Sequence, residues 1–221
     1  AVALVVSGGH TSLYHLTGPV TFRRLGATRD DAAGEAFDKV ARLLDLPYPG
    51  GPSIERAARG GDPSTFPLPR TSPGRGKSGP RTLDFSFSGL KTAVLYKAFG
   101  QDARPKQAVL SEPRVPVADI AAGFQKAVVD VLVKTTLRAA EQTGVREIVL
   151  GGGVAANTLL RERMRAAGER RGLRVVIPPR ELCTDTAAMV AVSGWFRLRE
   201  GERDGLDLDC HPRPIRAAGR G

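Results

Sequence analysis

The sequence predicts an α/β fold, and three observations support this. Short apolar segments typical of strands occur at Val2–Val6, Thr11–Leu16 and Glu147–Leu150. The longest helical pattern, Ala118–Gln142, repeats apolar side chains every three or four residues along one face. A glycine-rich loop joins the strand ending at Leu150 to a further helical segment. Strands that alternate with helices predict a sheet covered by helices.

The N-terminal segment reads as a β-meander. A turn of small residues at Ser7–His10 separates the first two strands, and Gly18 with Pro19 forms a second turn. A third strand is expected over Val20–Leu25.

Helices are expected to follow the meander. Asp30 and Asp31 place carboxylates where a helix N-terminus favours negative charge. Pro47 and Pro49 end this helix, and a tight glycine loop leads into a short helix beginning at Ile54.

The middle of the chain alternates between loops and helices. Residues 60–82 are rich in Pro, Gly, Ser and Arg, which predicts an exposed, flexible basic loop. A helix is expected from Gly89 to Phe99, and residues 101–116 form a second loop.

The C-terminal part continues the alternating pattern. Gly144 ends the long helix, and Asn157–Arg171 predicts another helix. Arg174–Ile177 is an expected strand, and Thr184 with Asp185 is expected to open a last helix that runs through Arg199.

Positive charge is abundant and clustered. The net charge is +10, and basic residues gather in two stretches, 70–106 and 161–180. Such stretches suit a polyphosphate partner, because each neutralised phosphate releases counterions. A solvated basic surface with no partner explains the same pattern equally well.

Composition and segment lengths indicate a cytoplasmic protein without a membrane partner. No apolar run approaches the roughly 20 residues that span a bilayer, and the start does not resemble a signal peptide. Cys183 and Cys210 give no disulfide framework. Because Ala1 lies directly before an apparently buried strand, we expect further residues upstream or on another chain.

Three small-residue loops are candidates for anion binding. They are Val5–Thr11, Pro49–Ser53 and Leu150–Asn157. Paired glycines let backbone amides approach a phosphate without a Cβ in the way, and the third loop leads into a helix N-terminus. None matches the Walker or dinucleotide pattern. Together the loops favour a nucleotide site.

Asp185 has two interpretations. An Asp at a predicted helix start is commonly a capping residue, and it is also a plausible ligand for a hard cation. Three scattered histidines, His10, His15 and His211, cannot build a metal site from this chain alone.

Six motifs in one register resemble the tRNA adenosine threonylcarbamoyltransferase family. The resemblance runs from residue 1 to about residue 214, and the tail after Pro214 lies outside it. The matching segments are Val5–Thr11, Asp30–Lys39, Tyr48–Pro52, Asp84–Thr92, Gly152–Asn157 and Cys183–Asp185.

The resemblance implies the actin, Hsp70 and sugar-kinase fold, in which nucleotide binds between two RNase H-like lobes. We expect residues 1–50 to be the remainder of a truncated N-terminal lobe. Residues 51–221 are expected to form the C-terminal lobe, with a helical insertion at about 53–142.

The implied activity is transfer of a threonylcarbamoyl group from threonylcarbamoyl-AMP to tRNA. The acceptor is the exocyclic amine of the adenosine 3′ of the anticodon, in tRNAs that read codons starting with A. The implied partners are tRNA, a homologous partner subunit and a small ATPase.

Individual site residues follow from the matched motifs. The resemblance implies that the hairpin Val5, Val6, Ser7, Gly8 and Gly9 binds substrate, and that Asp185 is a metal ligand. The basic stretches, including Lys91 and the Arg161–Arg174 face, are candidates for contact with the tRNA backbone, and no catalytic residue is assigned. The nucleotide or substrate contacts implied elsewhere are Asp38, Gly51, Glu55 and Asn157.

One departure from the family concerns the metal. The resemblance implies one divalent metal, iron or zinc, held by Asp185 together with two histidines spaced HxxxH ahead of this segment. Those histidines are absent from the sequence. We therefore expect the chain to hold most of a pocket for an adenine nucleotide, but to be inactive or metal-poor alone.

Three alternative functions make different demands on the sequence. An O-carbamoyltransferase or hydrogenase-maturation domain commonly has Gly-Gly-Val-Phe-Gln-Asn where this chain has Ala155 and Ala156 before Asn157. A non-catalytic scaffold subunit would usually lose the substrate loop and the metal aspartate, and both are present. A peptidase would need the HxxxH zinc site.

Overall fold

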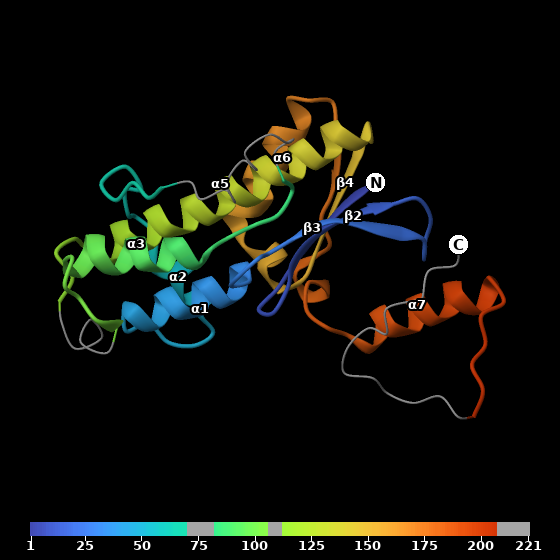
Figure 1. Cartoon of the computed structure of the whole chain (residues 1–221), viewed down its shortest axis with the longest axis horizontal. Helices are drawn as coiled ribbons and strands as arrows, with labels where there is room; N and C mark the ends of the chain where they lie inside the picture. The colour runs from blue at the N-terminus through green and yellow to red at the C-terminus, as the bar shows by residue number, and fades with distance from the viewer. Residues whose placement is uncertain (70–81, 106–111, 207–221) are drawn as a thin grey trace. The chain divides into compact units, whose positions relative to one another are not determined.

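The computed structural model describes residues 1–69, 82–105 and 112–206 and divides into two compact units (Figure 1). The first unit is Ala1–Asp185 and the second is Thr186–Gly221. The second unit contains the helix α7 (Ala187–Arg199). Most of the expected basic loop, together with Cys210 and the C-terminal tail, lies outside the described residues.

A mixed five-stranded sheet forms the centre of the first unit. Its strands are β1 (Val2–Val6), β2 (Thr11–Leu16), β3 (Phe22–Ala27), β4 (Glu147–Gly151) and β5 (Arg174–Val176). Their order is β3-β2-β1-β4-β5. The first three strands form the expected antiparallel meander, while β4 pairs parallel to β1 and β5 parallel to β4. This is the RNase H-like sheet that the resemblance implied.

The division expected at residue 50 is not a boundary between compact units. β1, β2 and β3 precede that residue and β4 and β5 follow it, yet all five share one sheet. Because Leu4 pairs with both Leu13 and Leu150, separating the segments would break the sheet at its central strand. Residues 1–50 therefore belong to the same lobe as residues 51–185.

The core lies between the sheet and helices that cover it. Val2, Leu4 and Val6 lie on the same face of β1 and are fully buried, as expected for a strand face that packs on the core. The long helix α5 (Val117–Thr143) packs against α2 (Gly50–Ala57), α3 (Ser88–Phe99) and α6 (Thr158–Glu169) (Figure 1).

An aromatic pair ties α5 to the helix that follows the meander. Phe124 of α5 meets Phe37 of α1 (Ala33–Leu43) edge to face, with ring centroids 5.3 Å apart. Both rings are buried. Truncating a buried Phe to Ala typically costs about 3–5 kcal/mol, so this contact is a major link between the two helices.

The start of α1 is capped differently from the sequence expectation. The residue before the helix, Ala32, offers no capping side chain, and the N–H of Ala33 instead donates to Thr11 Oγ1 at 2.9 Å. Asp31 pairs with Lys39 at 2.6 Å. Asp30 accepts hydrogen bonds from Ser86, Phe87 and Ser88, so neither carboxylate caps α1.

Two other helix starts differ from expectation. α2 begins at Gly50 rather than Ile54, so the second small-residue loop forms the first turn of a helix. α7 begins at Ala187, where Thr186 accepts from the N–H of Met189, so Thr184 and Asp185 lie before the helix.

Part of the segment expected to be a flexible loop is packed on the core. Phe66 is fully buried, and Lys97 of α3 lies 4.7 Å from its ring centroid. Lys97 also donates to the carbonyl of Pro67 at 2.7 Å. Residues 70–81 lie outside the described part of the chain.

No helix in the described residues is both long and apolar enough to cross a membrane.

Candidate functional site

The first and third glycine loops lie side by side because β1 and β4 are parallel neighbours. Val5 is in register with Gly151, so the loops leave the same edge of the sheet. Open α/β sheets bind ligands outside the carboxyl ends of their parallel strands. The third loop includes the short 3₁₀ helix η1 (Gly153–Ala156).

A cleft of about 530 Å³ lies at this edge. Five of the residues proposed from sequence line it, from four separate parts of the chain: Gly8, Asp38, Gly51, Glu55 and Asn157. Cleft residues that the sequence left unassigned include Gly34, Tyr48, Arg56, Arg59 and Arg180. Residues of all three small-residue loops therefore lie around one cleft.

Other proposed residues do not line the cleft. Val6 is fully buried in the core, and Val5, Ser7 and Gly9 belong to the hairpin without facing the cavity. Asp185 follows Thr184, which does line it. Lys91 is half-buried on α3 and takes no part in the cleft.

Gly34 holds the hairpin close to α1. A Cβ at this position would lie 2.6 Å from the carbonyl oxygen of Ser7 and 2.7 Å from the Cα of Gly8. The N–H of Gly34 donates to that same Ser7 carbonyl at 3.1 Å. A larger residue at 34 would push Gly8 out of position.

Hydrogen bonds lock one wall of the cleft. Asn157 caps α6 by accepting from the N–H of Leu160 at 3.0 Å. Its Nδ2 donates to Glu55 at 3.1 Å and to Gln125 at 2.9 Å. Since both amide hydrogens are engaged, a ligand can reach Asn157 only through the remaining acceptor capacity of Oδ1.

Glu55 also holds the start of α6. Its carboxylate accepts from the N–H of Thr158 at 3.2 Å and from the Thr158 hydroxyl. Arg180 donates to that hydroxyl at 2.7 Å. Glu55 thus joins α2 to α6 and also lines the cleft.

Three arginines of the cleft were missed by the sequence reasoning. Arg56 donates to Ser53 at 3.0 Å, while Arg59 has no side-chain partner in the described residues. Together with Arg180 they place positive charge around the glycine loops, as a phosphate group requires. No local pattern in the sequence distinguishes these three arginines from the other basic residues.

Tyr48 is an exposed aromatic residue at the rim. Its side chain is 85% exposed although it lines the cleft. A phenol ring in this position offers a flat face on which a base can stack.

Asp30 links two of the matched motifs, and Asp84 ties the second motif to the residues just before the first. Asp30 accepts from the N–H of Phe87 at 2.8 Å and from the hydroxyl of Ser88 at 2.9 Å. Asp84 accepts from the N–H of Ala27 at 3.1 Å and pairs with Arg29. Desolvation raises the pKa of each carboxyl, but the hydrogen bonds outweigh it and leave both pKa values lowered.

The described residues do not fit a metal centre. They contain no group of three or more His, Cys, Asp or Glu side chains able to share one ion. Asp185 is exposed and supplies a single carboxylate. One donor does not hold a zinc or iron ion in a protein, since such sites use three or four.

The family follows from sequence comparison. The family model described as tRNA N6-adenosine threonylcarbamoyltransferase matches residues 1–192. The chain belongs to this family. A relative of that name from Symbiobacterium thermophilum is 54% identical over 211 residues, and one from Moorella thermoacetica is 50% identical over 217 residues. Each alignment covers 96% of this chain, which spans 58% of either relative's length.

A solved structure supports the fold. The chain is similar to HypF of T. kodakarensis with a TM-score of 0.53 and 23% identity, over 82% of this chain and 21% of that one. This likeness concerns the fold alone, which agrees with the actin-like architecture implied by the sequence.

Proposed function

We propose that the complete protein transfers the threonylcarbamoyl group of threonylcarbamoyl-AMP to the exocyclic amine of the adenosine 3′ of the anticodon, in tRNAs reading A-starting codons. This chain supplies the nucleotide-binding wall of the site. One observation supports this proposal most directly. In this member of the family, a single cleft is lined by Gly8, Asp38, Gly51, Glu55 and Asn157.

The cleft's chemistry suits an acyl-adenylate donor. The donor is a mixed anhydride, so the amine attacks its carbonyl carbon, the bond from that carbon to the phosphate oxygen breaks, AMP leaves with the electron pair of that bond, and the amine nitrogen releases one proton to solvent. The protein needs to orient the two groups and stabilise the phosphate. Arg56, Arg59 and Arg180 carry the charge for this, and Tyr48 offers a stacking face for adenine. No residue is assigned as a base.

The metal and the protein partners are part of the proposal for the complete protein. A divalent iron or zinc ion would require ligands beyond Asp185, since the described residues supply no complete set. No step above depends on it. A homologous partner subunit and a small ATPase are expected to act with the protein, with the adenine nucleotide as substrate and product.

The test is an assay of transfer to unmodified tRNA. The complete gene product that contains this sequence is compared with the 221-residue chain, using threonylcarbamoyl-AMP and mass spectrometry of the digested nucleosides. We expect modified adenosine with the complete protein and little or none with the chain alone. Transfer to a small-molecule hydroxyl instead of tRNA would favour the O-carbamoyltransferase alternative.

Nucleotide binding is tested separately on the chain itself. AMP affinity measured by calorimetry is expected to fall at least tenfold in an Arg59→Ala, Arg180→Ala double variant, because each charge-assisted hydrogen bond is worth about 1.5–3 kcal/mol. The distant Arg165→Ala substitution serves as the control. Equal AMP affinity in all three proteins would contradict the assignment of the cleft.

A further inference from the structure

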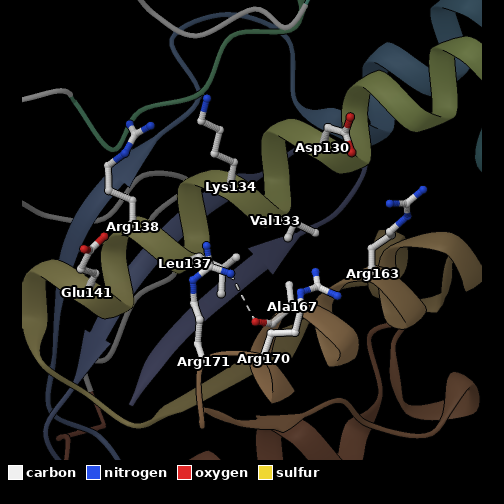
Figure 2. Close-up of a pocket in the computed structure, with 10 residues that line it drawn as sticks. All are labelled: Asp130, Val133, Lys134, Leu137, Arg138, Glu141, Arg163, Ala167, Arg170 and Arg171. Carbon is white, nitrogen blue, oxygen red and sulfur yellow. Dashed lines mark hydrogen bonds between the residues drawn. The ribbon is translucent and has the colours of Figure 1, made fainter.

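A second concave surface lies between α5 and α6, well apart from the residues of the cleft. Figure 2 shows this groove, whose volume is about 450 Å³. Its apolar floor is formed by Val133, Leu137 and Ala167, and it shares no lining residue with the cleft. The charged residues around it are Asp130, Lys134, Arg138, Glu141, Arg163, Arg170 and Arg171.

The positive charge of this groove is largely uncompensated. Within the described residues, no hydrogen bond or ion pair engages the side chain of Lys134, Arg163 or Arg170. Arg138 and Arg171 donate to backbone carbonyls only, at 3.3 and 3.4 Å. Five cations thus face two carboxylates, which favours an anionic ligand.

One of the two carboxylates is already neutralised. Asp130 forms an ion pair with Lys126 at 2.8 Å, one helical turn before it on α5. Glu141 lies at the opposite end of the groove from Asp130 (Figure 2). The central part of the groove is therefore bordered by cations alone.

We propose that this groove binds the phosphate backbone of RNA, namely the tRNA acceptor of the proposed function, on which the inference rests. The backbone positions of Arg163 and the C-cap residue Arg170 are about 10 Å apart along the axis of α6, at roughly 1.5 Å per residue, and Arg171 follows directly. This length matches several successive phosphates of one strand, rather than one small anion. Arg170 and Arg171, which follow the end of α6, reach toward α5, while Lys134 and Arg138 extend from α5 on its other side in this view (Figure 2).

The position of α6 connects the groove to the cleft. Asn157 caps the N-terminus of α6 at the cleft, and Arg170 follows its C-terminus at the groove. The helix axis separates them by roughly 20 Å at about 1.5 Å per residue. A polynucleotide whose target base enters the cleft can therefore continue along α6 and contact the groove.

The groove favours RNA over an acidic protein. Protein interfaces are typically anchored by buried aromatic side chains, and no aromatic residue lines this groove. Arginine predominates among its cations, and its planar guanidinium binds phosphate oxygens in pairs.

The experiment measures tRNA binding by the 221-residue chain with Arg163→Glu and Arg170→Glu combined. The control combines Arg42→Glu and Arg165→Glu, which changes the net charge equally at exposed positions outside the groove. Fluorescence anisotropy with unmodified tRNA gives the dissociation constant at several salt concentrations. Calorimetry with AMP and thermal unfolding verify that each variant folds.

We expect the groove variant to bind tRNA at least 30-fold more weakly, against less than threefold for the control. Its slope of log affinity against log salt should fall by about two, since each lost phosphate contact removes about 0.9. Equal losses in both variants, or an unchanged slope, would overturn the proposal. If the charge reversal unfolds the chain, the double variant with Arg163→Gln and Arg170→Gln is measured instead. Its slope of log affinity against log salt must be reduced, and an unchanged slope overturns the proposal.

The outcome is separable from that of the proposed function. If the complete protein modifies tRNA while the groove variant binds it normally, the groove proposal alone is wrong. If tRNA is never modified but the groove variant still loses RNA affinity, the proposed reaction is wrong and the groove remains an RNA surface.

Discussion

The Nδ2 atom of Asn157 lies 3.1 Å from a carboxylate oxygen of Glu55, joining α6 to α2 across 102 residues of sequence. The family resemblance implies that both residues contact the ligand, and the structure shows that each is also the other's partner. The cleft wall is therefore held by the same side chains that are proposed to recognise the nucleotide.

Replacing Asn157 with Asp should test this contact. The variant keeps the helix cap but sets a carboxylate against Glu55, so we expect about 2–4 kcal/mol of destabilisation at pH 7.5. Repulsion raises the pKa of the introduced carboxyl, and the stability deficit should shrink as the pH falls toward 5. Urea unfolding at both pH values measures this. Asn157→Ser loses the same amide bonds without adding charge, so its deficit should not change with pH.

Gly50 and Gly51 should respond differently to alanine. A Cβ at Gly50 would lie 2.5 Å from the Cα of Asp38, whereas one at Gly51 has nothing within 4 Å. Gly50→Ala should therefore destabilise the chain by about 1–3 kcal/mol through overpacking. Gly51→Ala should leave the melting temperature nearly unchanged and weaken AMP binding, because its methyl group enters the cleft. Equal stability losses in the two variants would contradict this assignment.

Asp30 should contribute a pH-dependent part of the stability. Its lowered pKa means that the stabilisation is present above the unfolded pKa, near 4, and is lost as the pH falls through the folded pKa. Asp30→Asn should cost about 1–2 kcal/mol at pH 7, since it weakens several hydrogen bonds. The difference from the unsubstituted chain should decline below about pH 4 in denaturant unfolding. A difference that stays constant down to pH 2 would show that the charge of Asp30 plays no part.

The 221-residue chain should not bind a transition metal tightly. Its described residues contain no cluster of three or more side chains able to bind one metal ion. Asp185 alone provides a single carboxylate as a ligand. After dialysis against zinc or ferrous iron, elemental analysis should find well under one ion per chain. Asp185→Ala should give the same result. Stoichiometric metal that disappears in this variant would show that the chain completes a site by itself.

Lys91 should contribute modestly to tRNA binding. It is half-buried on α3, and no ion pair engages it in the described residues. Lys91→Glu should lower tRNA affinity three- to tenfold and reduce the salt slope by about one, as loss of one phosphate contact requires. AMP affinity should not change. An unaltered salt slope would remove Lys91 from the RNA-binding surface.

Part of the candidate site was accessible from sequence because glycine-rich corners and the family motifs are local patterns. Gly8, Gly51 and Asn157 were proposed in this way and line the cleft. The arginines were not identified, because 33 basic residues leave no local signal for the few that face one cavity. Gln125 was also missed, since an amide on a long helix gains its role only from the helix that meets it.

The sequence by itself determined where most strands and helices form and to which family the chain belongs. Periodic apolar side chains and turn residues act over a few neighbours, so the meander, α5 and its end at Gly144 could be read directly. Only the tertiary structure decided that residues on both sides of position 50 share a sheet, and that Thr11 caps α1. These outcomes depend on hydrogen bonds between residues far apart in sequence, which exist only once the strands and helices have packed together.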